Sequence, residues 1–411
     1  MAHGDDTGAH GALLSLDVAL ARYAVIRPLA SARRAPEAAL GHVLAAPATA
    51  AVDLPGFTQS AVDGYALCVA DLAGGAPLRL AGEVRAGVAA DAPLRAGQVM
   101  RIFTGGRLPE GADTVARQEI VTRDGDTIIV AGALERGADV RQRGEELRAG
   151  ASLAVAGQRL HAGLVAALAM AGVREIEAIA PPRVTLLVTG DEIATDGKPA
   201  AAGVHDANGP LVRSWFRERG LPAPTTRYVI DDRARLCDAL VAALAEADLV
   251  LTTGGVSVGD HDLVRPVATG LGVREVFWQV AQKPGKPLYF GMREGSDGGQ
   301  KLVLGLPGNP AAVLIGLHVH VAAVLARLQG EAAPTPAWRS GRLAAPVRGD
   351  AREQLLRMTL RIDEAGQIWL DRLGRQASHM LSNLSTASAL ARIPAGAALE
   401  AQAVVQWLPL P

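Results

Sequence analysis

The sequence predicts a multidomain protein of the class α/β plus β, and three observations support this. A length of 411 residues is enough for roughly two to four domains, each with its own core. Strand-like runs alternate with helical segments between residues 182 and 330, which is typical of a three-layer domain with a mostly parallel sheet. Short alternating runs separated by turn residues fill 51–148 and return after 331, and they indicate two β regions.

The composition is that of a globular protein and excludes several classes of function. Hydrophobic residues make up 49% and charged residues 20%, which argues against a disordered chain. The formal net charge is −1 and aromatic residues are 3%, so we expect neither a nucleic-acid-binding nor a membrane-binding protein. Cys68 and Cys237 are too few for a disulfide framework or a cysteine-based zinc site. Residues 1–10 show no signal-peptide pattern, so we expect a cytoplasmic protein.

The N-terminal part of the chain predicts a helical linker domain that holds an inserted β domain. Apolar side chains recur at helical spacing over 13–24, over 38–44 and, after the first β region, over 157–172. We therefore predict a discontinuous helical domain formed by 1–50 and 149–181, with the inserted β domain at 51–148.

Residues 182–330 predict the α/β domain. Strands are expected at 183–190, 226–230, 248–253, 273–280 and 301–308. The first helix should have Asn208 as its cap and Gly220 at its C-terminal end, and the second should turn Leu236, Leu240, Val241 and Leu244 inward. Further helices are expected near 260–270 and at 310–328. The apolar run 311–326 is shorter than a bilayer requires, so we expect a buried helix.

The proline-rich segment 331–338 predicts a linker to a C-terminal β domain, so that this last domain covers 331–411. Two strands, 355–362 and 368–373, lie on either side of the turn sequence DEAGQ and predict a hairpin.

Three glycine-bearing sequences follow strands of the α/β domain: TGDE (189–192), TTGGVSVGDHD (252–262) and LPGNP (306–310). The carboxyl ends of parallel strands share one edge of the sheet, where backbone N–H groups can approach an anionic ligand. Each motif alone would indicate only a turn. The three together predict an anion-binding crevice, although neither common nucleotide-binding signature is present.

The same edge carries a group of carboxylates, and two interpretations of them stay open. They are Asp191, Glu192, Asp206, Asp231, Asp232, Asp260 and Asp262. An aspartate after a strand often caps the next helix, and this explains Asp206, Asp231 and Asp260 equally well. Carboxylates in an anion-binding crevice also suit Mg²⁺, which bridges them to substrate phosphates.

Lysine usage points to a small oxyanion. Only four of the 41 basic residues are lysine, and two of these, Lys283 and Lys286, lie in the single turn QKPGKP (282–287). Lysine presents a compact point charge that arginine does not replace. His318 and His320 lie in an apolar helix and are expected in the core or at an interface.

The β region contains two further motifs, DLPGFTQSAVDGYAL (53–67) and RIFTGGRLPEGAD (101–113). On their own, Asp63–Gly64 and Thr104–Gly106 would predict hairpin turns. No spacing of serine, cysteine and histidine indicates a covalent nucleophile.

Together these motifs resemble the molybdopterin molybdenumtransferase family, which includes the gephyrin E domain. The matching segments are SAVDGYA (60–66), FTGGRLPEGAD (103–113), VRQRGEEL (140–147), TGDE, DAN (206–208), TTGGVSVGDHD, QKPGKP and LPGNP. The resemblance covers about residues 50–390 and implies a C-terminal β barrel-like domain and a homodimer. In such a homodimer the cleft combines the α/β domain of one chain with the β domain of the other. The implied reaction takes adenylylated molybdopterin, molybdate and Mg²⁺, and it releases AMP and leaves molybdenum on the pterin dithiolene.

The resemblance also implies roles for individual residues. The expected catalytic residues are Asp63, Thr104, Glu192, Asp232 and Asp262, of which Glu192 and Asp262 would hold the metal. Lys283, Lys286, Arg357 and Ser378 would hold molybdate. The loops that bind the pterin substrate would contain Gly190, Gly254, Gly255, Ser257, Pro307, Gly308, Asn309 and Pro310. The sequence departs from the family at Glu146, where aspartate is usual, and either Asp231 or Asp232 could take the family role.

Three alternatives differ in what they require of the chain. A molybdopterin adenylyltransferase, or a nucleotide pyrophosphatase or amidohydrolase with a TGDE-bearing domain, would need only the α/β domain. A scaffold protein of the gephyrin kind would need a partner-binding tail. The molybdenumtransferase interpretation also leaves room for transient contacts with the preceding adenylyltransferase or with apo-molybdoenzymes.

Overall fold

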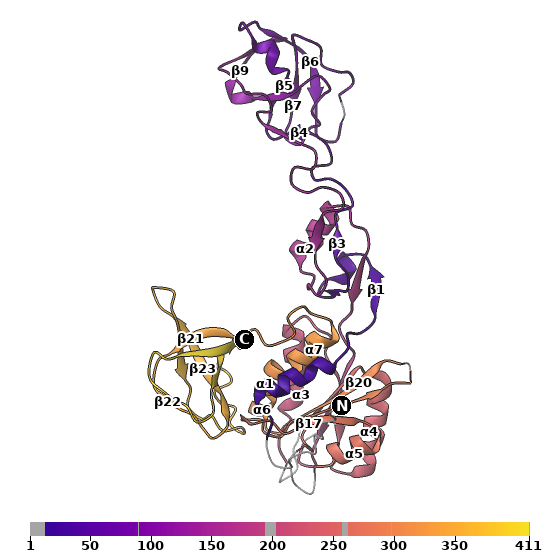
Figure 1. The fold of residues 1–411 in the computed structure, drawn as a ribbon, viewed down its shortest axis with the longest axis vertical. Coiled ribbons are helices and arrows are strands. Elements are labelled where there is room, and N and C mark those ends of the chain that lie inside the picture. The colour runs from indigo at the N-terminus through magenta and orange to yellow at the C-terminus, as the bar shows by residue number, and fades with distance from the viewer. Residues whose placement is uncertain (1–12, 89, 194–202, 257–261, 297, 411) are drawn as a thin grey trace, which may run out of the picture.

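The fold is taken from a computed structural model that describes residues 13–88, 90–193, 203–256, 262–296 and 298–410. The chain is elongated: a β domain lies at one end, a small region with α2 and β3 lies in the middle, and the α/β domain and a C-terminal β domain lie together at the other end (Figure 1).

The inserted β domain is confirmed as a mixed six-stranded sheet in the order β8-β5-β7-β6-β10-β9. The strands are β5 (Gly64–Leu67), β6 (Leu78–Val84), β7 (Gln98–Ile102), β8 (Thr114–Arg117), β9 (Val121–Asp124) and β10 (Thr127–Val130), and the pair β4 (Gln59–Ser60) with β11 (Val140–Arg141) lies beside them. Alternate residues of β5 enter two different clusters, Tyr65 and Leu67 in one and Ala66 in the other. Alternate side chains of β5 therefore pack on opposite faces of the sheet, in keeping with the period of two along a strand.

The middle region contains less helix than the sequence predicts. Its helix is α2 (Ala162–Met170), which begins after His161, whose ring accepts a hydrogen bond from the Leu164 backbone N–H. Short strands pack beside it: β1 (Ser31–Arg34), β2 (Val43–Leu44), β3 (Ala48–Thr49), β12 (Ser152–Ala154) and β13 (Ile176–Ile179).

The predicted helix over 38–44 is wrong. Only a 3₁₀ turn forms here, at Glu37–Ala39. Gly41 follows it with a φ of +79°, which a helix does not allow. Val43 then pairs with Ile179 in an antiparallel ladder, so pairing with a distant strand buries the side chains that gave the helical pattern. The apolar pattern over 13–24 does form a helix, α1 (Leu16–Arg22), but its apolar side chains join the core of the α/β domain.

The α/β domain has a six-stranded sheet in the order β15-β14-β16-β20-β19-β17. Its strands are β14 (Val184–Thr189), β15 (Thr225–Val229), β16 (Leu249–Thr253), β17 (Arg274–Trp278), β19 (Tyr289–Glu294) and β20 (Gln300–Leu306). The first four strands in this order are parallel, as predicted, whereas β19 pairs antiparallel with β20 and β17. The sequence analysis missed β19, which a short connection joins to β20 and thereby allows antiparallel pairing.

Helices cover both faces of this sheet. One face packs against α1, α3 (Asn208–Glu218) and a long helix built from α6 (Pro310–Gly316), the π-helical segment Leu317–Val321 and α7 (Ala322–Leu328). The other face packs against α4 (Arg233–Glu246) and α5 (Val264–Gly270). Two details differ from the prediction: Ala207, not Asn208, is the cap of α3, and Val241 of α4 is exposed.

The helix Pro310–Leu328 is long and apolar enough to cross a membrane by length and composition, but 83% of its most apolar window is buried inside the fold. This is how the core helix of a globular domain behaves, and it agrees with the buried helix that the sequence predicts.

The C-terminal domain is a closed five-stranded barrel. Its strands are β21 (Arg339–Leu343), β23 (Glu353–Ile362), β24 (Ile368–Arg372), β25 (Ala389–Ile393) and β27 (Val404–Pro409), and a pair of short strands, β22 (Val347–Arg348) and β26 (Ala398–Leu399), lies beside them. The barrel closes because β23 pairs with both β24 and β25. One short strand of the α/β domain, β18 (Gln282–Lys283), pairs with β23, so the QKPGKP turn is attached to the barrel.

Candidate active site

A cavity of about 180 Å³ lies where the α/β domain meets the barrel. It is lined by Gly254, Gly255, Val256, Asp262, Gly285, Pro287, Pro307, Gly308, Asn309, Ala312 and Ser378. Two of the three glycine loops, the lysine-bearing turn and a loop of the barrel thus contribute to one cavity. The structure brings these predicted elements together although they are spread over more than 120 residues of sequence.

The loop after β16 requires glycine at its first position. Gly254 has a φ of +95°, and a Cβ there would lie 2.7 Å from the Thr189 hydroxyl at the end of β14. The Gly254 N–H donates to the Leu306 carbonyl at 3.0 Å, so this loop is hydrogen-bonded to the end of β20. The backbone can make these close approaches only because the side chain is a hydrogen atom.

The LPGNP segment connects the sheet edge to the barrel. Asn309 donates from Nδ2 to the Ser378 hydroxyl at 3.0 Å, and the Ala311 N–H donates to the Ser378 carbonyl at 3.2 Å. On the other side, Asn208 Nδ2 donates to the Gly308 carbonyl at 2.7 Å. Pro310 takes the first position of α6, where its missing N–H costs no intrahelical bond. Ser378 is therefore held beside the LPGNP segment.

Arg357 is buried, with 1% of its surface exposed. Its guanidinium donates to the carbonyls of Arg375, Ala377 and Met380 at 2.9, 3.2 and 3.0 Å. Burial lowers the pKa of Arg357 from its ordinary value. In this arrangement the side chain braces the loop that carries Ser378.

The two lysines of QKPGKP have different environments. Lys283 is half-exposed and its Nζ lies 2.6 Å from a carboxylate oxygen of Asp350. The hydrogen bond from Lys283 is the largest cause of a lowered pKa at Asp350. Lys286 is partly buried between Gly285 and Pro287, which both line the cavity. Sequence reasoning missed Asp350, since nothing in its local pattern distinguishes it from other loop aspartates.

A buried chain of hydrogen bonds leads from the helical core to the lysine turn. The Tyr23 hydroxyl lies 3.0 Å from His320 Nδ1, His320 Nε2 lies 2.9 Å from Gln282 Oε1, and Gln282 Nε2 donates to the Gly285 carbonyl at 3.1 Å. Because the Gln282 amide nitrogen donates to Gly285, its oxygen accepts, and His320 therefore carries its proton on Nε2. Burial lowers the pKa of His320 to about 3, so the ring is neutral. His320 is a core residue, as predicted, but the sequence did not reveal its link to the turn.

Several of the predicted carboxylates accept hydrogen bonds from neighbouring groups and so stabilise the local structure. Asp232 caps α4 by accepting from the Arg235 N–H, and Asp206 accepts from the Gly209 N–H and from the Tyr228 hydroxyl. Asp191 accepts from the Asp231 N–H at 2.9 Å. Asp232 is therefore a helix cap, whereas Asp206 precedes the cap residue Ala207 and accepts from an N–H in the first turn of α3.

Two acidic residues are placed differently. Asp262 is partly buried and lines the cavity itself. Glu192 follows Gly190, where a Cβ would lie 2.6 Å from the Glu192 carboxylate, so glycine makes room for this side chain beside the strand end. Ser257 and Asp260 lie outside the described residues.

Asp63 and Thr104 form a separate cluster in the inserted β domain. One carboxylate oxygen of Asp63 accepts from both the backbone N–H and the hydroxyl of Thr104, each at 2.8 Å. The backbone hydrogen bond is the largest cause of a lowered pKa at Asp63. The strands β5 and β7, which carry these loops, lie at the far end of the molecule from β20 and α6 (Figure 1). Within one chain the structure does not bring this cluster to the cavity.

Comparison with known proteins covers nearly the whole described chain. Residues 14–172 match the model described as MoeA N-terminal region (domain I and II), residues 185–327 a probable molybdopterin binding domain, and residues 340–410 the MoeA C-terminal region (domain IV). The molybdopterin molybdenumtransferase of Haemophilus influenzae is 32% identical over 339 residues, which are 80% of this chain and 81% of that protein.

The chain belongs to the molybdopterin molybdenumtransferase family. The family member from Nostoc is also 32% identical, over 87% of this chain and 84% of its own length. The crystal structure of the molybdopterin biosynthesis MoeA protein from Pyrococcus horikoshii superposes with a TM-score of 0.80 at 26% identity, covering 97% of this chain and 99% of that one. The protein is thus an enzyme of molybdenum cofactor biosynthesis that acts on molybdopterin. The adenylyltransferase and pyrophosphatase alternatives would leave the N-terminal and C-terminal family matches unexplained.

Proposed function

We propose that this enzyme transfers molybdenum from molybdate to adenylylated molybdopterin and releases AMP in a Mg²⁺-dependent reaction. The observation that carries this proposal is the convergence of the TTGG loop, LPGNP, the lysine turn and Ser378 on one cavity. In the reaction the anhydride bond between the two phosphoryl groups breaks and AMP leaves with one of them. The oxygen that the break requires comes from water or from an oxide that molybdate gives up.

The chain's own residues would act mainly by positioning and by neutralising charge. The open backbone at Gly190, Gly254, Gly255 and Gly308 would let the pyrophosphate approach closely. Lys286 and Lys283 would supply positive charge to molybdate, a small dianion, and Ser378 would donate a hydrogen bond. Arg357 would act by holding the Ser378 loop in place, since three of its hydrogen bonds go to backbone carbonyls of that loop.

The acidic residues fit a magnesium site that the substrate completes. Among the described residues there is no group of three or more histidine, cysteine and acidic side chains that could hold a metal alone. Mg²⁺ commonly takes one or two carboxylates and completes its shell with phosphate oxygens and water, which suits Glu192 and Asp262. When bound, the ion would neutralise the charge that develops on the departing phosphate.

We further infer that the working site is formed by two chains. The strands that carry Asp63 and Thr104 lie at the far end of their own chain from the cavity, so these residues could reach it only from a second copy (Figure 1). A homodimer with this cross-chain arrangement would give both residues access to the substrate. We also propose brief contacts with the preceding adenylyltransferase or with apo-molybdoenzymes, and a cytoplasmic location.

The direct test of the reaction is incubation of the purified protein with adenylylated molybdopterin, Mg²⁺ and molybdate while AMP is measured. We expect AMP to appear only when all three are present, and molybdenum to be recovered on the pterin. AMP release that is independent of molybdate would instead indicate a pyrophosphatase.

The two-chain site is tested by mixing two inactive variants, Asp63→Ala and Glu192→Ala. A mixed dimer contains one intact cleft, so we expect part of the activity to return after subunit exchange. If exchange is confirmed by mass and no activity returns, each site is built within one chain.

The role of the lysine turn is tested by Lys286→Ala. Loss of a cation from a molybdate site should raise the KM for molybdate by roughly tenfold while binding of the adenylylated pterin changes little. Equal losses for both substrates would place Lys286 on the pterin phosphate instead.

A further inference from the structure

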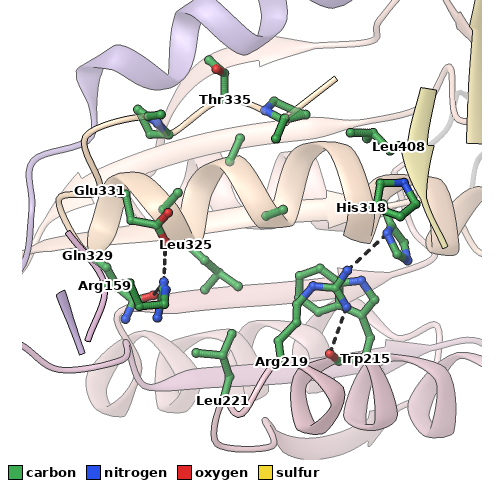
Figure 2. Close-up of a pocket in the computed structure, with 18 of the residues that line it drawn as sticks. Arg159, Trp215, Arg219, Leu221, His318, Leu325, Gln329, Glu331, Thr335 and Leu408 are labelled. Carbon is green, nitrogen blue, oxygen red and sulfur yellow. Dashed lines mark hydrogen bonds and ion pairs between the residues drawn. The ribbon is translucent and has the colours of Figure 1, made fainter. Parts of the chain in front are cut away.

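A second cavity, of about 450 Å³, lies apart from the candidate active site and shares no lining residue with it. It is enclosed by the C-terminal end of α3, by α7, by the linker after α7 and by the end of β27 (Figure 2). Arg159 of the middle region also lines it. The cavity therefore sits where three parts of the chain meet, and its size falls within the range of about 300–1,000 Å³ typical of small-molecule sites.

Much of the wall is apolar. The small side chains of Ala322 and Ala326 on α7 leave space between the helix and the linker, and Leu221 and Leu408 line other parts of the surface (Figure 2). Such a wall favours a ligand with an apolar body, because transfer of that body from water is the main favourable contribution to its binding.

The charges at this cavity do not balance. Arg159, Arg219 and Arg339 line it, against one acid, Glu331. Glu331 is already ion-paired with Arg159. Among the described residues, neither Arg219 nor Arg339 has a carboxylate within ion-pair distance, so the cavity carries excess positive charge.

Arg219 is held in a fixed position. Its guanidinium lies over the Trp215 ring at 3.9 Å from the ring centre, and it contacts His318 Nδ1 at 3.3 Å and the Trp215 carbonyl at 3.4 Å (Figure 2). Stacking on an aromatic ring leaves other guanidinium N–H groups for a ligand, and it reduces the entropy lost when the ligand binds.

Three side-chain donors lie behind the wall, where solvent does not reach them. Because Arg219 donates to His318 Nδ1, the His318 ring carries its proton on Nε2, and this buried donor has no partner among the described residues. Trp215 Nε1 and Gln329 Nε2 are buried donors without partners as well. Because these atoms are shielded from solvent, a ligand in the cavity does not reach them, and Arg219 and Arg339 are the groups that favour an anion.

We propose that this cavity binds a small organic anion with an apolar body, of the class of aromatic carboxylates, with Arg219 as the main contact of the acid group. Inorganic phosphate would match the charge but leave the apolar wall unfilled, and a neutral aromatic compound would leave Arg219 without an acceptor. Because residues of three parts of the chain surround the ligand, its binding also stabilises their packing.

The test uses two probes that differ only in charge, 2-naphthoate and 2-naphthamide, titrated calorimetrically into the full-length protein. We expect the carboxylate to bind roughly tenfold or more tightly than the amide, as a charge-assisted hydrogen bond implies. Saturating naphthoate should also raise the melting temperature, since a ligand that binds only the folded state stabilises it. Equal affinity for the two probes, or binding of neither, would overturn the proposal.

Two variants and one control variant locate the binding. Arg219→Gln should lower the affinity for naphthoate to that for naphthamide, whereas Arg217→Gln, an exposed change on the same helix outside the cavity, should leave both affinities unchanged. Ala322→Phe should fill the cavity and abolish binding of both probes without changing a charge. Unchanged naphthoate affinity in Arg219→Gln would show that the probe binds elsewhere and that the proposal is wrong.

Discussion

The two groups of predicted functional residues differ in how they are built. At the sheet edge, Gly254, Gly308, Asn309 and Ser378 form a cross-braced cavity whose contacts come from three separate segments and are partly buried. In the inserted β domain, Asp63 and Thr104 form a pair with two hydrogen bonds of their own, and Thr104 is exposed.

Under the proposed two-chain arrangement, this contrast separates a cavity built within one chain from a pair of residues that would reach the substrate only from a second chain. A buried, cross-braced cavity is preorganised, so a single change disturbs several contacts at once. An exposed pair keeps its local geometry whether or not a second chain is present. We therefore expect substitutions in the cavity to lower the unfolding free energy more than substitutions in the Asp63 pair, and the predictions below test this difference.

The largest effect is expected at Asp262. If its carboxylate holds Mg²⁺ against the substrate, Asp262→Asn should lower the rate by roughly 100-fold, because loss of a charged metal ligand removes several kcal/mol of stabilisation. Extra Mg²⁺ should recover part of the rate by mass action. The measurement is AMP release at two Mg²⁺ concentrations.

Asp232→Asn is the matched control for this substitution. Asparagine caps a helix about as well as aspartate, and Asp232 already caps α4, so this variant should keep near-normal turnover and stability. A severe loss of turnover in Asp232→Asn, with normal rates in Asp262→Asn, would mean that Asp232 and not Asp262 holds Mg²⁺.

The next effect concerns Gly254. Alanine there would need a φ of +95° and would place a Cβ 2.7 Å from the Thr189 hydroxyl, so Gly254→Ala should cost about 2 kcal/mol or more of unfolding free energy. Distortion of the loop should also lower turnover by roughly tenfold, since small displacements of binding groups have large effects on rate.

Gly220→Ala separates backbone strain from the effect on the site. Gly220 also has a positive φ, +66°, but a Cβ there would meet nothing within 4 Å. We expect a stability loss of about 1 kcal/mol with normal turnover. The measurements are denaturant unfolding and steady-state rates of both variants. Equal turnover in Gly254→Ala and Gly220→Ala would mean that the Gly254 loop does not contact the substrate.

The parts of this structure that follow from local rules could be predicted from the sequence. The glycine loops were placed at one edge because the carboxyl ends of parallel strands always share an edge, and the cavity at Gly254 and Gly308 agrees with that. For Asp206 the sequence leaves a cap and a ligand open, and only the structure shows that its carboxylate accepts from the Gly209 N–H in the first turn of α3.

What could not be predicted depends on pairing between distant residues. Val43 gave a helical pattern but pairs with Ile179, and periodicity contains no information about such a partner. The contact between Tyr23 and His320 joins residues 297 positions apart. Its effect on the lysine turn depends on the orientation of two buried rings and one amide, which composition and spacing do not encode.

A smaller effect is expected from the chain that ends at Gly285. Gln282→Met removes the amide that joins His320 to the turn, so the turn should lose its fixed position and the KM for molybdate should rise by roughly fivefold, with little change in kcat. Unfolding free energy should fall by about 1–3 kcal/mol, because His320 loses its acceptor.

Tyr23→Phe is the control for that substitution. It removes a hydrogen bond at the far end of the same chain and should cost a similar amount of stability, yet it leaves the bonds to Gly285 in place. The KM for molybdate should therefore stay at its normal value. An equal rise in KM in both variants would mean that general destabilisation, not the position of the turn, causes the change.

The smallest effect is expected at Thr104, whose hydroxyl bond to Asp63 can be removed without removing its backbone bond. The folded-state pKa of Asp63 is lowered first by the Thr104 N–H and then by its hydroxyl, so these bonds stabilise the domain above the ordinary carboxyl pKa, and the stabilisation is lost as the pH falls through the folded-state pKa. Thr104→Val removes the hydroxyl only. The Asp63 pKa, followed by NMR titration, should rise but stay below its ordinary value, because the larger backbone contribution remains, and Thr104→Ser should restore it. A return to the ordinary value in Thr104→Val would show that the loop itself had moved, and the Asp63 pair would then depend on its surroundings as much as the cavity does.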